Sequence, residues 1–196
     1  MAPLPALLLA SALLLAGSAL FNRYDAGSGG TTTTTHLHFY MHDDYTGLRP
    51  TAMHIVSGRS LGTPAVSDNT NSTVPSTSAP RQFGDIVALN NALTEGPGCG
   101  SAWVGTAQGF AVRVSEGGVV SDLSMHLVLG AGDYSGSSLA VKGRIDMELA
   151  VRESMIIGGT GQFRLAQGYM LSKSYDYSLA AGGIVEIDLY VQVQHD

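Results

Sequence analysis

The most informative part of the sequence is the stretch Ile156-Ile157-Gly158-Gly159-Thr160-Gly161-Gln162-Phe163-Arg164-Leu165-Ala166-Gln167-Gly168-Tyr169. Glycine occupies three of the four positions from 158 to 161. Glycine permits positive φ angles and lets the backbone approach neighbouring atoms closely. The apolar residues on both sides read as strands, so the stretch predicts a tight corner between two strands.

Two other segments show the alternation of apolar and polar residues that is typical of strands. In the segment 185–193, every second residue is apolar: Val185, Ile187, Leu189, Val191 and Val193. The segment 139–149 alternates in the same way, with Gly143 as an expected kink. No segment has a convincing helical pattern. Strands with one apolar face require a sandwich or a closed barrel, and the pattern alone does not choose between them.

The glycine-rich corner closely resembles the signature of plant dirigent proteins, which guide the coupling of phenolic radicals. The resemblance covers roughly residues 36 to 193 and includes three upstream motifs in the family's order, Phe39-Tyr40-Met41-His42-Asp43, Val104-Gly105-Thr106-Ala107-Gln108-Gly109-Phe110, and Gly136-Ser137-Ser138-Leu139 through Gly143-Arg144. It implies an all-β fold, an eight-stranded antiparallel β-barrel with a central pocket that assembles as a homotrimer. A barrel of eight strands can hold one small ligand.

The amino-terminal residues 1–19 are predicted to be a signal peptide. The run from Leu7 to Ala16 is apolar except for one serine, and the small residues 17–19 follow it. The run is too short to span a bilayer. We therefore expect a secreted protein, which for a dirigent relative means the extracellular space or apoplast. Residues 20–35 are expected to form a flexible arm, and residues 36–196 the barrel domain.

One internal segment, from Ser57 to Gln82, lacks the residues needed for a core. Ser, Thr, Pro, Gly and Asn dominate it, so we expect a long mobile loop within the barrel domain. It contains the sequon Asn71-Ser72-Thr73, which makes Asn71 a candidate glycosylation site. The single cysteine, Cys99, excludes an intramolecular disulfide, so the core must stabilise the fold without one.

Charge and hydropathy exclude two classes of partner. The net charge is −6 and the ten Lys and Arg residues do not cluster, which argues against nucleic acid. After the signal peptide, no stretch is long enough to cross a membrane, so no membrane partner is expected. The family resemblance implies a phenolic small molecule as ligand, a separate oxidase (laccase or peroxidase) that produces its radical, and no cofactor.

Asp43 is the first candidate for a catalytic residue. Leu37, Phe39 and Met41 alternate onto the same face of the segment His36–Asp44, which predicts that the face points inward and carries Asp43 with it. Burial of a carboxylate raises its pKa and makes it able to exchange protons near neutrality. The residues alone leave open a solvated Asp at the strand end. The resemblance favours the pocket, because dirigent proteins carry an Asp there.

The opposite face of this segment presents three histidines, His36, His38 and His42. A His-x-His pair on a strand is how cupin barrels bind a metal, but such a site also needs a carboxylate and another histidine from other strands, such as His54 or His126. Outward histidines on a polar face are more often surface or subunit-contact residues. We therefore expect no metal.

Arg152 is the second candidate for a catalytic residue. The resemblance places an arginine at this position on the rim of the dirigent pocket, where its guanidinium could hold a phenolic oxygen or orient a carboxylate. A surface ion pair with Glu153 or Glu148, of little energetic value, is the alternative. The sequence leaves both open.

The chain departs from the dirigent proteins that form pinoresinol from coniferyl alcohol. Those proteins resemble one another in having a Tyr at the first of two positions and often an Asp at the second. This chain has Ala111 and Ile145 at these positions, although Asp146 is adjacent to the second. A second acid, Asp44, follows Asp43 where an apolar residue is commoner. The residues predicted to contact the substrate are Phe39, Ala111, Ile145 and Ser174.

Three functions follow from the resemblance. The first is a dirigent auxiliary that imparts stereoselectivity on the coupling of phenoxy radicals from monolignols in lignan and phenylpropanoid biosynthesis. The second is an acid-catalysed dehydratase or cyclase that acts through a quinone methide, as family members that form pterocarpans do. The third is a non-catalytic binding protein of the wall or of plant defence.

Overall fold

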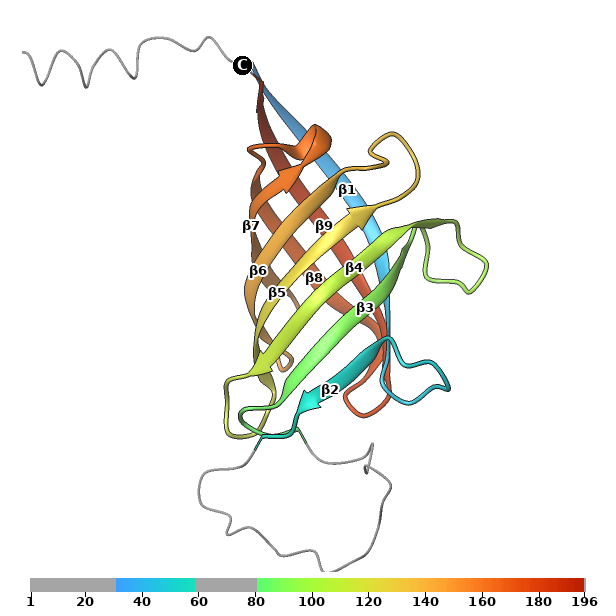
Figure 1. The fold of residues 1–196 in the computed structure, drawn as a ribbon, viewed down its shortest axis with the longest axis vertical. Helices are drawn as coiled ribbons and strands as arrows, with labels where there is room; N and C mark the ends of the chain where they lie inside the picture. The colour runs from blue at the N-terminus through green and yellow to red at the C-terminus, as the bar shows by residue number, and fades with distance from the viewer. Residues whose placement is uncertain (1–30, 59–80, 196) are drawn as a thin grey trace, which may run out of the picture. The chain divides into compact units, whose positions relative to one another are not determined.

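The computed structural model describes residues 31–58 and 81–195, and these form strands joined by turns (Figure 1). The strands are β1 (Thr31–Asp44), β2 (Ala52–Val56), β3 (Ile86–Thr94), β4 (Trp103–Arg113), β5 (Val120–Leu129), β6 (Ser138–Asp146), β7 (Arg152–Thr160), β8 (Gln167–Ser178) and β9 (Gly182–His195), with the 3-10 turn η1 (Gly161–Phe163) after β7. Within the described residues no helix has the length and apolar character needed to cross a membrane.

Several predictions from sequence lie outside the described residues. These are the signal peptide, Asn71 and most of the loop expected between Ser57 and Gln82. The first strand begins at Thr31 rather than at His36, so the last five residues of the expected arm belong to β1. All five are threonines, whose branched side chains favour extended backbone.

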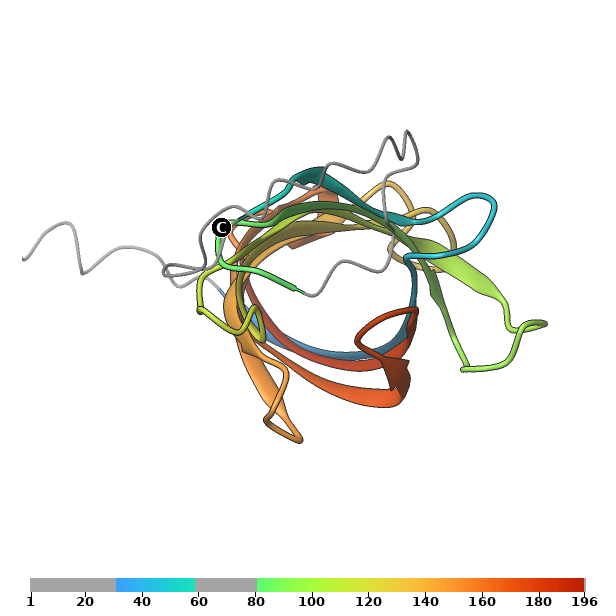
Figure 2. The same ribbon diagram turned by 90° about the horizontal axis from the view of Figure 1, so that it is seen from below.

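Strand pairing closes the sheet into a barrel, whose compact unit is Thr33–Val193. The strands follow the order β1-β9-β8-β7-β6-β5-β4-β3-β2, and an additional pairing between β1 and β3 completes a ring of eight, seen end-on in Figure 2. β1 pairs with the last residues of β3, while β2 pairs with its first residues. The expected eight-stranded antiparallel barrel is therefore confirmed, with β2 as a ninth strand beside the ring.

The glycine-rich corner at the end of β7 allows the chain to turn against β6. A Cβ on Gly159 would lie 2.5 Å from the carbonyl oxygen of Ser138, and Gly161 has a φ of 62°. Only glycine tolerates this approach and this conformation without strain. The turn places Phe163, which is 1% exposed, over one end of the barrel interior, where its ring packs against Tyr134 at a centroid distance of 4.9 Å.

That end of the interior is packed with apolar side chains. The five residues that alternate along β9 from Val185 to Val193 all face inward and are buried, in agreement with the sequence pattern; Leu189, Val191 and Val193 lie toward this end, whereas Val185 and Ile187 line the cavity at the other end. Leucines of the neighbouring strands, among them Leu127 on β5 and Leu139 on β6, are fully buried with them. Burial of this apolar surface is the main stabilising contribution to the fold.

Candidate functional site

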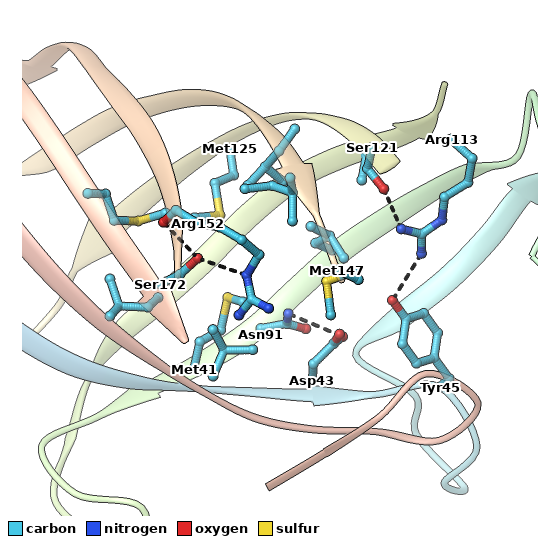
Figure 3. A pocket seen from close by; sticks show the side chains of 17 residues that line it. Met41, Asp43, Tyr45, Asn91, Arg113, Ser121, Met125, Met147, Arg152 and Ser172 are labelled. Atoms are coloured by element: carbon cyan, nitrogen blue, oxygen red, sulfur yellow. Dashed lines mark hydrogen bonds between the residues drawn. The ribbon is translucent and has the colours of Figure 1, made fainter. Parts of the chain in front are cut away.

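A cavity occupies the other end of the barrel interior, where β1, β4 and β6 end and β5, β7 and β9 begin (Figure 3). Its volume is about 630 Å³ including the part open to solvent. Most of its wall is apolar. The polar side chains in the wall are Asp43, Tyr45, Asn91, Arg113, Ser121, Arg152 and Ser172.

Asp43 is the single acidic side chain among the residues that line the cavity. It lies on the inward face of β1 and is 7% exposed. Asn91 Nδ2 donates a hydrogen bond to Oδ1 at 3.3 Å, and the hydroxyl of Tyr177 donates one to Oδ2 at 2.6 Å. Burial raises the pKa of Asp43 above its ordinary value, although these two hydrogen bonds oppose the rise. The carboxyl group can therefore hold a proton at a higher pH than a solvated Asp.

Tyr177 reaches Asp43 because β8 is irregular. The register between β8 and β9 shifts between Ser174 and Asp176, which interrupts the alternation of inward and outward side chains. Tyr177, an odd-numbered residue, thus points inward, against the core and toward Asp43, as the even-numbered Met170 and Ser172 do earlier on the strand. Burial raises the pKa of the Tyr177 hydroxyl, so this group remains a neutral hydrogen-bond donor.

Arg152 opens β7 with its side chain in the cavity wall, and it is 3% exposed. Its Nη1 donates to Ser174 Oγ at 3.1 Å and its Nε to Ser172 Oγ at 3.5 Å. Burial lowers the pKa of Arg152, but an arginine stays protonated in proteins. Since its partners are neutral serine hydroxyls, the guanidinium brings an uncompensated positive charge to the cavity. The surface ion pair considered from the sequence does not form.

A second guanidinium, that of Arg113 at the end of β4, is also buried, with 5% exposure. Its Nη1 donates to Ser121 Oγ at 2.5 Å, and its Nη2 donates to the Tyr45 hydroxyl at 3.3 Å. Arg113 Nε and Asn91 Oδ1 have no hydrogen-bond partner among the described residues. Buried polar atoms without partners are costly, so a ligand that supplied both a donor and an acceptor would stabilise the site.

Taken together, these side chains form a polar end of an otherwise apolar cavity. In the view of Figure 3, Asp43 and Asn91 are drawn between the guanidinium of Arg152 and the pair Arg113–Tyr45. The lining contains two guanidiniums for one carboxyl group, so it favours a ligand that carries oxygen atoms or gains negative charge. A proton donor that is oriented inside an apolar cavity can act as a general acid.

The comparison with known proteins gives the family. A family model described as Dirigent-like protein matches residues 34–192. The chain belongs to the dirigent family. Among relatives of this dirigent protein, Dirigent protein 1 of Arabidopsis thaliana is 38% identical over 157 residues, which cover 80% of this chain and 78% of that protein. Pterocarpan synthase 1 of Glycine max is 35% identical over 159 residues, which cover 80% and 77%.

Solved structures of relatives have the same fold. Two pterocarpan synthase dirigent proteins superpose on the chain with TM-scores of 0.69 and 0.66, at 32% and 34% sequence identity. The superpositions cover 82% and 81% of this chain and 88% and 94% of those chains.

Four residues had been predicted to contact the substrate of this dirigent protein. Ala111 and Ile145 line the cavity. Phe39 instead lies in the apolar core and does not line the cavity, because Met41 and Asp43 occupy the inward positions nearer the end of β1. Ser174 is exposed and contacts the site only through Arg152.

The two additional acids noted in the sequence stay outside the cavity of the dirigent barrel. Asp44 accepts hydrogen bonds from the backbone N–H groups of Thr46 and Gly47, each at 2.9 Å, and so stabilises the turn after β1. Asp146 accepts a hydrogen bond from the backbone N–H of Glu148 at 3.2 Å. Neither replaces the acid missing at Ile145.

Sequence reasoning missed Arg113, Asn91, Tyr45 and Tyr177. Arg113 carried a usable signal, because it continues the inward alternation of Ala107, Gly109 and Ala111 on β4. An arginine on such a face is unusual and indicates a site. Tyr177 gave no such signal, since the irregularity in β8 that turns it inward is not visible in the pattern.

Proposed function

We propose that this dirigent protein binds a phenolic molecule in the cavity and gives stereoselectivity to the coupling of phenoxy radicals derived from monolignols. One observation carries the proposal. Asp43, buried with a raised pKa and hydrogen-bonded by Tyr177, lies in an apolar cavity that also contains two guanidiniums. This arrangement suits an aromatic ligand that carries oxygen and needs a proton at one stage.

The proposed reaction begins outside the barrel. A separate oxidase removes one electron and one proton from each phenol, and two of the resulting radicals join through a new C–C bond to give quinone methides. Coupling of radicals needs little acceleration, so the contribution of the protein is orientation. The apolar wall, including Leu89, Leu123 and Met125, fixes the face of the ring that is open to attack.

The subsequent ring closure requires proton transfer. A hydroxyl group of the coupled molecule attacks the quinone-methide carbon, the carbonyl oxygen gains a proton, and the attacking hydroxyl loses one. Asp43 in its protonated form donates the first proton and, once ionised, accepts the second. A guanidinium of Arg152 or Arg113 binds the phenolic oxygen as negative charge develops on it.

A specific observation supports a second candidate, an acid-catalysed dehydratase. Because Ala111 and Ile145 contribute no acid or hydroxyl, Asp43 is the one carboxyl group in the cavity wall. A dehydration needs one such acid and no oxidant. Asp43 donates a proton to a leaving hydroxyl, the C–O bond breaks and water departs. The phenolic proton then passes to the ionised Asp43, directly or through water, which gives a quinone methide and restores the acid. The presence of pterocarpan synthases among the relatives also supports this candidate.

One experiment with two arms separates these functions. The purified protein is first incubated with coniferyl alcohol and a laccase, and the enantiomeric excess of the coupled product is measured. In the second arm it is incubated with an isoflavanol and no oxidant, and dehydrated product is measured. Selectivity in the first arm alone supports the coupling auxiliary, whereas turnover in the second supports the dehydratase. If neither selectivity nor turnover is observed, the result favours a binding protein without a catalytic role.

The proposal includes the setting expected from the sequence. We propose secretion into the extracellular space after removal of residues 1–19, glycosylation at Asn71, and assembly as a homotrimer. Amino-terminal sequencing of the secreted protein, glycosidase treatment and light scattering test these three points, and each can fail without changing the assignment of the cavity.

A further inference from the structure

The outer face of the barrel carries a second cluster of polar groups, on β1 and β9. Asp188 Oδ1 lies 3.0 Å from His36 Nε2 and 2.9 Å from His38 Nδ1, so one carboxylate oxygen joins two imidazoles. Glu186 is on the same face of β9. One potential ligand atom from each of His38, Glu186 and Asp188 lies within 4.8 Å of the other two. The cluster thus offers imidazole and carboxylate donors from two adjacent strands.

Aromatic neighbours hold both imidazole rings. The ring of His36 stacks on Tyr190 at a centroid distance of 4.7 Å, and Tyr190 stacks in turn on Tyr169 at 4.8 Å. The ring of His38 meets the edge of Tyr40 at 5.1 Å. Groups that orient a histidine ring support metal binding, because they lower the entropy lost when the ring is fixed.

The two donor spacings that involve Asp188 Oδ1 suit a metal ion. Zinc binds nitrogen and oxygen at about 2.0–2.1 Å, and a tetrahedral arrangement then places the donor atoms about 3.3 Å apart. The contacts of Asp188 with the two histidines are within a few tenths of an ångström of that spacing. Side-chain movements of that size are small.

We propose that His36, His38 and Asp188 form a binding site for a divalent transition metal on the outer wall of the barrel, with Glu186 as a fourth donor. From the sequence, the His-x-His pair of β1 suggested a metal motif but no metal was expected, because the carboxylate that completes the site comes from a strand more than 140 residues away and reaches the histidines only when the barrel closes. Glu186 is also 3.8 Å from Lys173 Nζ, so it joins the metal only by leaving that contact.

The chemistry of the donors selects the metal. Two imidazoles with one or two carboxylates suit Zn²⁺ and Cu²⁺ far better than Ca²⁺ or Mg²⁺, which prefer oxygen alone. The side chains of His36 and His38 are 50% and 35% exposed, so the metal has access from solvent. The site is separate from the cavity, because successive residues of β1 point to opposite sides of the barrel wall.

Isothermal titration calorimetry with Zn²⁺ and with Cu²⁺ tests the site. The protein must carry no polyhistidine tag and must first be treated with a chelator. The expected result is one saturable site per chain, with affinity reduced roughly tenfold or more in His38→Gln and in Asp188→Asn. The control is His126→Gln, an exposed histidine on the outer face of β5, which should bind as the unmodified protein does.

A second readout keeps the test independent of folding. Metal that joins β1 to β9 should raise the melting temperature of the unmodified protein and of His126→Gln, but not that of Asp188→Asn. Circular dichroism without metal verifies that the three variants retain the barrel. Absence of saturable binding, or equal binding by His38→Gln, Asp188→Asn and His126→Gln, would overturn the proposal.

Discussion

The two ends of the barrel interior are built from the same strands but have opposite character. At the end covered by η1, the inward residues are apolar and buried, as Leu127 on β5 and Val191 on β9 show. At the other end several inward positions of the same sheet carry polar side chains, and these form one part of the wall of a cavity. The apolar end contributes mainly stability, and the polar end contributes the candidate chemistry.

On three strands the change from apolar to polar takes place within two residues. Met41 is followed by Asp43 on the inward face of β1, Ala111 by Arg113 on β4, and Met170 by Ser172 on β8. Burying one arginine or aspartate in the middle of the core would be very costly, but a strand end is close to solvent and to flexible turns. The site therefore lies where the barrel tolerates charge.

The largest expected effect is that of Asp43→Asn on activity. The amide has nearly the shape of the carboxyl group but cannot donate or accept the proton of a quinone methide, so selectivity or turnover should fall by about 10²–10⁴-fold. Since the packing is retained, the melting temperature should change by no more than a few degrees. Chiral chromatography of the product and a thermal scan measure the two quantities.

Asp44→Asn is the matched control for this variant. Asp44 is the neighbouring acid, but it faces away from the cavity and stabilises a turn. It should leave activity unchanged. If Asp43→Asn retained the enantiomeric excess and the turnover of the unmodified protein, Asp43 would not belong to the site.

The next effect is on stability and concerns the apolar end. Leu127→Ala removes a fully buried side chain from the core of β5, which should lower the free energy of unfolding by about 2–5 kcal/mol. The polar end should keep its activity at temperatures where the variant is folded. Urea denaturation and the two-arm activity assay test this separation, with Val128→Ala, a change on the outer face of the same strand, as control.

The sequence predicted the apolar end better than the polar end, for a physical reason. Burial of apolar side chains is the dominant favourable contribution to folding, so the alternation along β9 identifies Val185 to Val193 as inward. Each apolar residue of the pattern is separate evidence for the inward face. The corner at Gly159 and Gly161 could also be predicted from the sequence, because any side chain at these positions would clash with neighbouring atoms. The core thus depended on signals that are local in the sequence, whereas the choice of a barrel over a sandwich depended on the family resemblance.

The polar end depends on contacts between distant strands, which the sequence does not display. The bond from Tyr177 to Asp43 joins residues 134 positions apart and requires a register shift in β8. Asn91 gave no signal, since a single buried amide looks like any polar residue of a strand. The residue pattern did not decide whether Asp43 and Arg152 lie in the pocket or at the surface. They were predicted as site residues because the family resemblance was added to that pattern.

A smaller effect is expected from Arg152→Lys. Lysine keeps the charge but cannot present two N–H groups in a plane, so it loses the geometry that holds Ser172, Ser174 and a phenolic oxygen together. Loss of a hydrogen bond to a charged group costs about 1.5–3 kcal/mol, which corresponds to roughly 10–150-fold weaker substrate binding. Binding assays with the phenolic substrate measure it. Arg144→Lys, at an exposed position on β6, should bind as tightly as the unmodified protein.

The smallest effect, and the most specific, is that of Tyr177→Phe on the pH profile. Burial raises the pKa of Asp43 above the ordinary 3.8, and the hydrogen bond from Tyr177 partly opposes this. If the protonated form is the active one, activity of the unmodified protein falls as the pH rises through the raised pKa. Removing the hydroxyl withdraws the opposing interaction, so the fall should move to higher pH, while stability decreases by about 1 kcal/mol.

Stability should follow the same titration with a definite sign. Because the folded state binds the proton of Asp43 more tightly than the unfolded state, the free energy of unfolding decreases as the pH rises from 3.8 through the raised pKa, and in Tyr177→Phe the decrease extends to higher pH. Denaturation at a series of pH values measures it. Tyr175→Phe, an exposed tyrosine two residues earlier on β8, should leave both profiles in place. A Tyr177→Phe profile that matched that control, or moved to lower pH, would show that the hydroxyl does not act on Asp43.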